Sequence, residues 1–122
     1  MSNERQCRIP EYLEHILDAI NRIKQYTEDI VEHVFLENEL VQDAVIRNIE
    51  IIGEACRNID RHYPEFAENY HDFPLRIAYE MRNVLAHGYF QIDLEIVWAT
   101  IENDLPKLEK QVKKILKNFH TG

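Results

Sequence analysis

Four side chains suited to acid–base and phosphate chemistry lie close together in the stretch MRNVLAHGYF, residues 81–90: Arg82, Asn83, His87 and Tyr89. A histidine titrates near neutral pH, so it can both accept and donate a proton. An arginine stays charged, and its planar guanidinium fits a phosphate group. These residue types together are suited to cleaving a phosphodiester without a metal ion. His87 would move the protons, and Arg82 would offset the growing negative charge.

The spacing indicates how these side chains would be arranged on a helix that ends at Gly88. Four residues turn about 400° around an α-helix, so Asn83 and His87 share a face and lie about 6 Å apart along the axis. Asn83 can then hydrogen-bond the imidazole and fix its orientation. Arg82 lies five residues before His87, about 140° away around the helix. Its long side chain would have to reach around the helix or act on a neighbouring chain, and the second arrangement would make a complete site from two copies of the helix.

The same residues also have an ordinary structural interpretation. Arginine and histidine near a helix end often form caps and surface hydrogen bonds, and a tyrosine after a glycine often only packs against its neighbours. The spacing alone does not decide between this interpretation and catalysis.

The elements that would position these residues are predicted from the hydrophobic pattern, which recurs at steps of three and four. We predict one helix from Pro10 to about Leu36. A second begins after Asn38, a suitable N-cap, and ends before Pro64. The stretch YPEFAENYHDFP is expected to be a connection that contains at most one short helical turn.

The second half of the chain has clear helix-start and helix-stop residues. Pro74 starts a third helix, and Gly88 ends it because glycine tolerates left-handed backbone angles. Asp93 can cap a fourth helix, LEIVWATIEND, which Pro106 should break or kink at about Asp104. A fifth helical piece, PKLEKQVKKILKNF, comes after it. The predicted fold is therefore all-α, an up-and-down bundle of four to five helices that forms one domain over residues 1–122.

The charge of the chain counts against a general nucleic-acid binder. The formal net charge is −8, and affinity for phosphate comes mostly from lysine and arginine. Any surface that acts on RNA must therefore be local. The lysines near the C-terminus form either such a surface or a solvated helix face that suits the helix dipole: Lys107, Lys110, Lys113, Lys114 and Lys117.

Metal and cofactor sites are not predicted. The six histidines are scattered, with no His-x3-His pair, and no glycine-rich phosphate loop is present. Cys7 and Cys56 fit no ligand spacing, and Cys56 falls in an apolar helical pattern that predicts a buried thiol. The start, MSNERQCRIP, lacks the apolar region of a signal peptide, and no apolar run approaches the roughly 20 residues that span a bilayer. We therefore expect a cytoplasmic location and no membrane partner.

The stretch RNVLAHGY resembles the Arg-x4-His-x-Tyr motif of the HepT-like toxins, which belong to the HEPN superfamily of small helical ribonucleases. The segments QDAVIRNIEIIGEACRNI before it and DLEIVWATIENDLPKLEKQV after it also resemble helices of that family. The resemblance runs from about residue 10 to residue 118, so it is more specific than the short motif alone.

The resemblance implies a homodimer in which two motifs face each other across a cleft. It also implies a metal-independent endoribonuclease that acts as the toxin of a type VII toxin–antitoxin pair. By position, Arg82 and His87 match the catalytic pair, and Asn83 matches the polar residue often found beside the arginine. Tyr89 matches the tyrosine to which a cognate nucleotidyltransferase antitoxin of the MNT type adds AMP. The added bulk and negative charge would compete with RNA.

A second interpretation is a non-catalytic helical module that binds a nucleotide or the partner nucleotidyltransferase. The net charge of −8 slightly favours it. The lysines between Lys107 and Lys117 distinguish the two interpretations. Lysines that line the cleft would favour RNA, and lysines that point away would favour the binding module.

Overall fold

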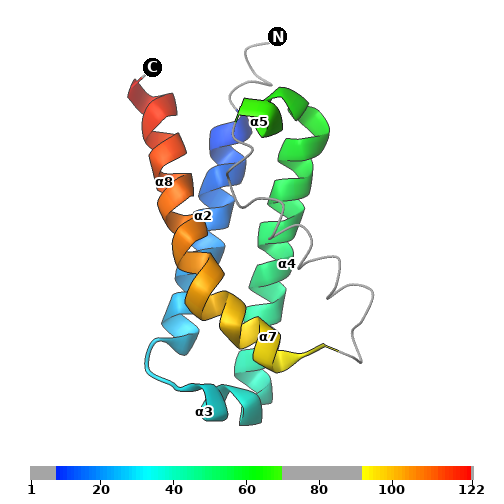
Figure 1. Cartoon of the computed structure of the whole chain (residues 1–122), viewed down its shortest axis with the longest axis vertical. Coiled ribbons are helices and arrows are strands. Elements are labelled where there is room, and N and C mark those ends of the chain that lie inside the picture. Colours follow the sequence, from blue (N-terminus) through cyan, green and yellow to red (C-terminus); the bar gives the residue numbers. More distant parts are fainter. Residues whose placement is uncertain (1–7, 70–91, 122) are drawn as a thin grey trace.

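The computed structural model describes residues 8–69 and 92–121, and every regular element in these residues is helical (Figure 1). The long helices are α2 (Arg8–Thr27), α4 (Glu39–His62) and α8 (Leu105–Thr121). The short helices are α3 (Glu32–Glu37), α5 (Pro64–Asn69) and α7 (Leu94–Ala99). The predicted all-α class is confirmed.

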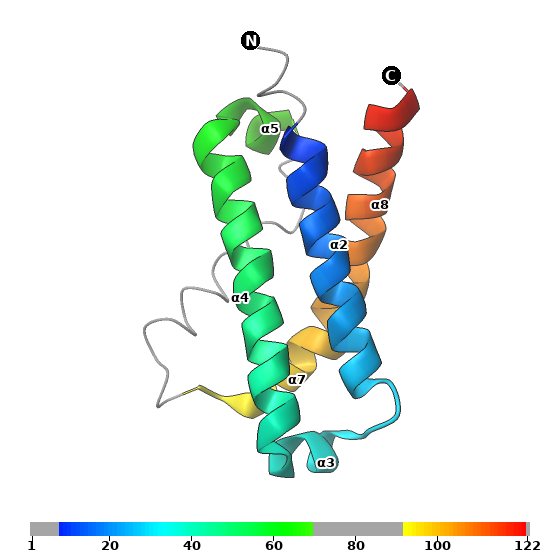
Figure 2. The ribbon, with the colours of Figure 1, turned by 180° about the vertical axis from the view of Figure 1, so that it is seen from behind.

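Helix α2 packs against both of the other long helices, with α4 on one side and α8 on the other (Figures 1 and 2). Helices α2 and α4 run in opposite directions, as expected for consecutive helices joined by a short connection. Helix α8 runs in the same direction as α4. Helix α3 lies across the end of the bundle where α2 finishes and α4 begins.

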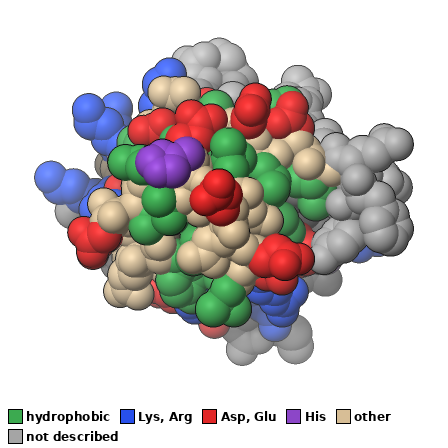
Figure 3. Space-filling model, turned by 90° about the horizontal axis from the view of Figure 1, so that it is seen from below, with side chains coloured by type: hydrophobic (Ala, Val, Ile, Leu, Met, Phe, Trp, Pro, Cys, Tyr) green, Lys and Arg blue, Asp and Glu red, His purple; other side chains and the backbone are tan. Residues whose placement is uncertain are grey.

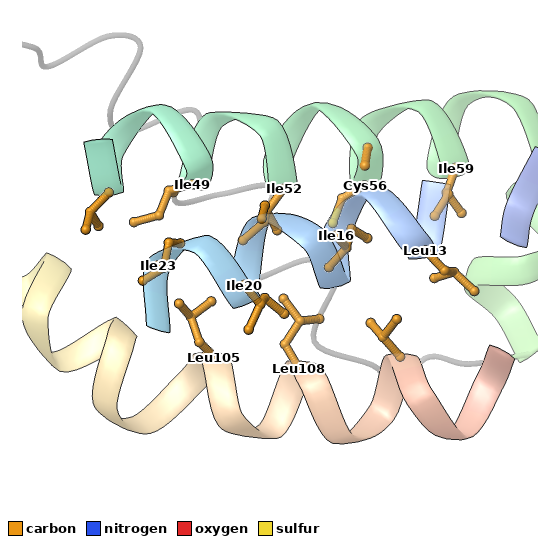
Figure 4. Close-up of a cluster of buried hydrophobic side chains, with 14 of the residues drawn as sticks. Leu13, Ile16, Ile20, Ile23, Ile49, Ile52, Cys56, Ile59, Leu105 and Leu108 are labelled. Carbon is orange, nitrogen blue, oxygen red and sulfur yellow. The ribbon is translucent and has the colours of Figure 1, made fainter. Parts of the chain in front are cut away.

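The core consists of the aliphatic stripes of the three long helices, which meet along the axis of the bundle (Figure 4). Each stripe has the three- and four-residue steps seen in the sequence, because those steps return a side chain to the same face of a helix. Full burial of each large aliphatic side chain contributes about 1.5–3 kcal/mol to stability. Among the most completely buried are Leu13, Ile16, Ile20, Ile23, Ile52, Ile59, Leu108 and Ile115.

The first helix ends earlier than predicted. It begins at Arg8 and ends at Thr27, whereas the pattern predicted one helix from Pro10 to about Leu36. Glu28 and Asp29 come immediately after it, and their negative charge is unfavourable at the C-terminal end of a helix dipole. The chain therefore leaves the helix, turns, and resumes as α3.

The second helix starts and ends where the sequence predicted. The Asn38 side-chain Oδ1 accepts a hydrogen bond from the backbone N–H of Val41 at 3.1 Å, and α4 ends at His62. Leu40, however, is 80% exposed although it fits the apolar three- and four-residue period of this helix. Gln42 is buried in the first turn instead, and its Nε2 donates to the Phe35 carbonyl oxygen at 2.8 Å. The reason is that α3 packs beside the start of α4 and offers a polar backbone group there.

Helix α7 and helix α8 form one bent helical segment. The Asp93 side chain accepts hydrogen bonds from the N–H groups of Glu95 and Ile96, so the predicted cap is confirmed. Between α7 and α8 lies the π-helical segment η2 (Thr100–Asp104). The Leu105 N–H donates to the carbonyl oxygen of Thr100, five residues back. The chain changes direction there, just before Pro106, as predicted (Figure 1).

Trp98 lies in the hydrophobic core. Its ring centroid is 5.2 Å from that of Phe35, with the ring planes tilted by 37°. This aromatic pair ties α3 to α7. Within the described residues, none of the helices is both long and apolar enough to span a bilayer.

Candidate functional site

The residues of the predicted catalytic motif lie outside the described residues: Arg82, Asn83, His87 and Tyr89. The helix predicted from Pro74 to Gly88 does so as well. The roles of these residues remain predictions from the sequence. The structure contributes the elements on either side of the motif and the surfaces around them.

The described elements that flank the motif lie at opposite ends of α4. Helix α5, which ends at Asn69 before the motif, packs on α4 at its C-terminal end. Ile92 and Leu94, which come after the motif, are half-buried against the core beside the start of α7. Helix α7 packs on α3, at the N-terminal end of α4 (Figures 1 and 2). Because α4 has 24 residues, these two ends are about 36 Å apart along its axis.

A polar link joins α2 and α4, and sequence reasoning did not single it out. Asn48 is only 4% exposed. Its Oδ1 accepts a hydrogen bond from Arg22 Nη1 at 3.0 Å, and its Nδ2 donates to the Ala44 carbonyl oxygen at 2.8 Å. The carbonyl oxygen and the NH₂ group of the buried amide therefore both have hydrogen-bond partners. The sequence signal was positional, since Asn48 stands three residues after Val45 and four before Ile52, inside the buried stripe.

The five lysines of α8 are all exposed on the side of the helix away from its buried stripe. The acidic residue among them, Glu109, has a side chain that is only 13% exposed. It forms ion pairs with Lys24 of α2 at 3.1 Å and with Lys113 at 3.5 Å. The residues of the predicted cleft are outside the described part of the chain. The position of the lysines relative to that cleft therefore still has to distinguish the two interpretations.

The opposite charge gathers at the end of the bundle where α3 lies. Residues 28–43 contain six acidic side chains and no lysine or arginine. Val31 and Leu40 are exposed among them. Figure 3 views this end and shows hydrophobic side chains interspersed with acidic ones, with lysine and arginine towards the edge of the view. The described surface therefore has an acidic end and a basic helix face.

The cysteine and histidine residues of the described chain form no reactive or metal-binding group. Cys56 is buried between α2 and α4, which confirms the predicted buried thiol (Figure 4). Burial raises the pKa of the Cys56 thiol, so it stays protonated and is a poor nucleophile. In residues 8–69 and 92–121, no three His, Cys, Asp or Glu side chains are placed to hold a metal ion.

The described helices form an all-α bundle consistent with a HEPN-like fold. Within this class, the chain belongs to the family described as ribonuclease HepT-like, whose family model matches residues 16–115. The resemblance seen in the sequence is thereby confirmed.

Three relatives illustrate the membership. The chain is 43% identical over 108 residues to "Gamma-glutamylcyclotransferase and putative RNase MJ0434" of Methanocaldococcus jannaschii, and the match covers 88% of the chain but 47% of that protein. The chain thus spans about half the length of this relative. It is 36% identical over 105 residues to "Putative RNase MJ1380" of the same organism, with 86% and 94% covered. It is 38% identical over 107 residues to "Probable ribonuclease HepT" of Thermococcus cleftensis, with 88% and 94% covered. No solved structure matches the chain.

Proposed function

We propose that this protein is a metal-independent endoribonuclease and the toxin component of a type VII toxin–antitoxin system. One observation carries the proposal: the Arg82-x4-His87-x-Tyr89 motif stands in a chain that belongs to the HepT-like ribonuclease family. Relatives that the chain matches over nearly their whole length are named probable ribonuclease HepT and putative RNase. RNA is therefore the proposed substrate.

The proposed reaction is an internal attack within the RNA. The 2′-hydroxyl oxygen of a ribose forms a bond to the adjacent phosphorus, and the bond from phosphorus to the 5′-oxygen of the next nucleotide breaks. His87 moves the proton between the attacking and leaving oxygens. Arg82 offsets the charge that grows on the phosphate oxygens, and Asn83 orients the imidazole. The site is proposed to combine Arg82 of one protomer with His87 of its partner, because the two positions are about 140° apart on one ideal helix.

The first test is cleavage of RNA in excess EDTA by purified protein whose mass shows no modification. We expect cleavage to continue in EDTA, because the proposed chemistry uses only protein side chains. The upstream product should end in a 2′,3′-cyclic phosphate, and the downstream product should begin with a 5′-hydroxyl. Activity that disappears in EDTA and returns with added Mg²⁺ would contradict metal independence. The absence of cleavage with or without Mg²⁺ would favour the non-catalytic binding module.

Control of the enzyme is proposed to act through Tyr89. The Tyr89 Oη attacks the α-phosphorus of ATP bound to a cognate nucleotidyltransferase of the MNT type, pyrophosphate leaves, and the phenol loses its proton. The product carries AMP on the tyrosine, two residues after His87. A bulky anion at this position would exclude the phosphates of RNA by charge repulsion and by steric overlap.

The Tyr89→Phe variant tests this control. Incubation of the protein with ATP and such a nucleotidyltransferase should raise the mass by one adenylyl group per modified tyrosine and stop RNA cleavage. Tyr89→Phe lacks the acceptor oxygen, so it should gain no mass and keep cleaving RNA under the same conditions. Tyr26→Phe, a change to an exposed tyrosine on α2, serves as the matched control and should behave like the unchanged protein. Adenylylation of Tyr89→Phe to the same extent would place the acceptor elsewhere.

A further inference from the structure

The outer face of α8 carries a regular stripe of positive charge. Lys107, Lys110, Lys114 and Lys117 succeed one another at steps of three, four and three residues, so they share one side of the helix. The ten residues from first to last correspond to about 15 Å along the axis. The opposite side of the helix is buried in the core. Because the opposite side of α8 is packed into the core, the lysine stripe faces away from the bundle.

The local acidic group does not neutralise this stripe. Glu109 is the one acidic residue between positions 105 and 121, and it lies towards α2, where it pairs with Lys24 and Lys113. Within the described part of the chain, Lys107, Lys110 and Lys114 take part in no ion pair. Three exposed ammonium groups are thus left to interact with an outside anion.

The stripe is positively charged although the chain as a whole is negatively charged. The whole chain has a formal net charge of −8, yet residues 105–121 contain five lysines and one glutamate. The end of the bundle at α3 is acidic (Figure 3). A polyanion that approaches the protein is therefore repelled from the α3 end and attracted to α8. Regularly spaced lysines match a regularly charged backbone, and they recognise it without regard to base sequence.

We propose that the face of α8 formed by Lys107, Lys110, Lys114 and Lys117 binds the phosphodiester backbone of single-stranded RNA. This inference rests on the proposed function for its choice of anion, and it adds a binding surface that lies apart in sequence from the motif. Each ammonium contacts phosphate oxygens as a point charge. The surface holds the strand but does not select its sequence.

The test measures RNA binding as a function of salt. A triple variant, Lys107→Gln, Lys110→Gln and Lys114→Gln, is combined with His87→Ala so that the RNA stays intact. Binding to a fluorescent single-stranded RNA of mixed sequence is measured by anisotropy. The slope of log affinity against log salt should fall by about 2, since each lost phosphate contact removes about 0.7 on a single strand. The corresponding loss of affinity near 0.1 M salt is about 10- to 100-fold.

Two matched variants separate the stripe from general charge and from helix damage. Replacement of the same three lysines by arginine keeps the charge and should keep the slope. Replacement of three other exposed cations, Arg8, Arg57 and Arg61, by glutamine removes the same charge and should leave the slope nearly unchanged. Circular dichroism should show equal helix content in all variants.

The inference is overturned if the lysine-to-glutamine triple binds RNA with the original slope, or if the arginine triple loses as much. A lysine triple that alters self-association in sedimentation but not the RNA slope would also overturn it, because α8 would then be a protein-binding face. Lysine-dependent RNA binding without cleavage either in EDTA or in Mg²⁺ would reject the proposed ribonuclease function while supporting this inference. If the unchanged protein cleaves RNA but the lysine-to-glutamine triple keeps the original salt slope of binding, this inference is rejected and the proposed function stands.

Discussion

Replacement of His87 by alanine is expected to lower the rate of RNA cleavage by about 10²- to 10⁴-fold, the usual contribution of a positioned general acid or base. The imidazole is the one group of the motif that titrates near neutral pH, so no neighbour in the motif can take over its proton transfer. The rate is measured under single-turnover conditions with protein in excess over RNA. Helix content should not change.

The matched control is His33→Ala, a change to an exposed histidine on α3. It should cleave RNA at the original rate, which would show that the loss is specific to position 87. An undiminished rate for purified His87→Ala would remove this residue from the mechanism. Loss of helix content in that variant would instead require His87→Gln, which keeps a polar side chain.

Mixed dimers show whether the site is shared. If Arg82 of one protomer works with His87 of its partner, then Arg82→Ala and His87→Ala protomers, each inactive alone, regain one intact site when combined. If both residues act within one chain, the mixture remains inactive. The shared arrangement is expected from the separation of about 140° between the two positions on an ideal helix.

Replacement of Phe35 by alanine is expected to lower the free energy of unfolding by about 3–5 kcal/mol, the range for truncating a fully buried aromatic residue. Phe35 is 0% exposed, and its ring packs against Trp98. It belongs to α3, a helix of six residues that has little stability of its own and depends on this contact. Urea unfolding can be monitored by the fluorescence of Trp98, the one tryptophan of the chain, and by circular dichroism.

Leu40→Ala is the matched control for this change. Leu40 lies at the same end of the bundle but is 80% exposed, so its truncation should alter stability by no more than about 0.5 kcal/mol. A loss below about 1 kcal/mol for Phe35→Ala, well under the usual range for a buried aromatic residue, would mean that α3 contributes little to the fold. The two probes should give one transition if the bundle unfolds cooperatively.

The sequence predicted helix boundaries well where a capping residue or a proline stands at the boundary itself. Asn38 and Asp93 cap helices with their own side chains, and Pro64 and Pro106 act through their missing N–H groups. The end of the first helix was missed because apolar residues such as Ile30 continue its period. The change to a turn depends on adjacent charges and on packing that periodicity does not contain.

Contacts between distant segments could not be predicted in this way. The exposed position of Leu40 depends on α3 lying beside the first turn of α4. The burial of Asn48 depends on Arg22, which is 26 residues away in the chain. A one-dimensional pattern records which side chains share a face but not which helix covers that face.

For the candidate site, the sequence predicts which residue types are present but not how they are arranged in space. The residue types and the family resemblance predict Arg82, His87 and Tyr89 as site residues, and their roles stay predictions. The family membership is confirmed over residues 16–115. The proposed pairing of Arg82 with His87 of a second chain would depend on how two chains pack. Sequence spacing within one chain does not contain that information.

The π-helical segment η2 has a consequence for how the length of this chain can change. A π turn holds about one residue more than an α turn, so it delays the rotation of the next helix, α8, by about 100°. The rotation of α8 about its axis, which turns Leu108 into the core, therefore depends on this segment. Deletion of one residue in this segment would keep every side chain of α8 but turn the helix about its axis, with its apolar face partly outward. The extra residue of the π turn thus sets the rotation of α8 about its own axis. This segment should therefore tolerate substitutions far better than deletions.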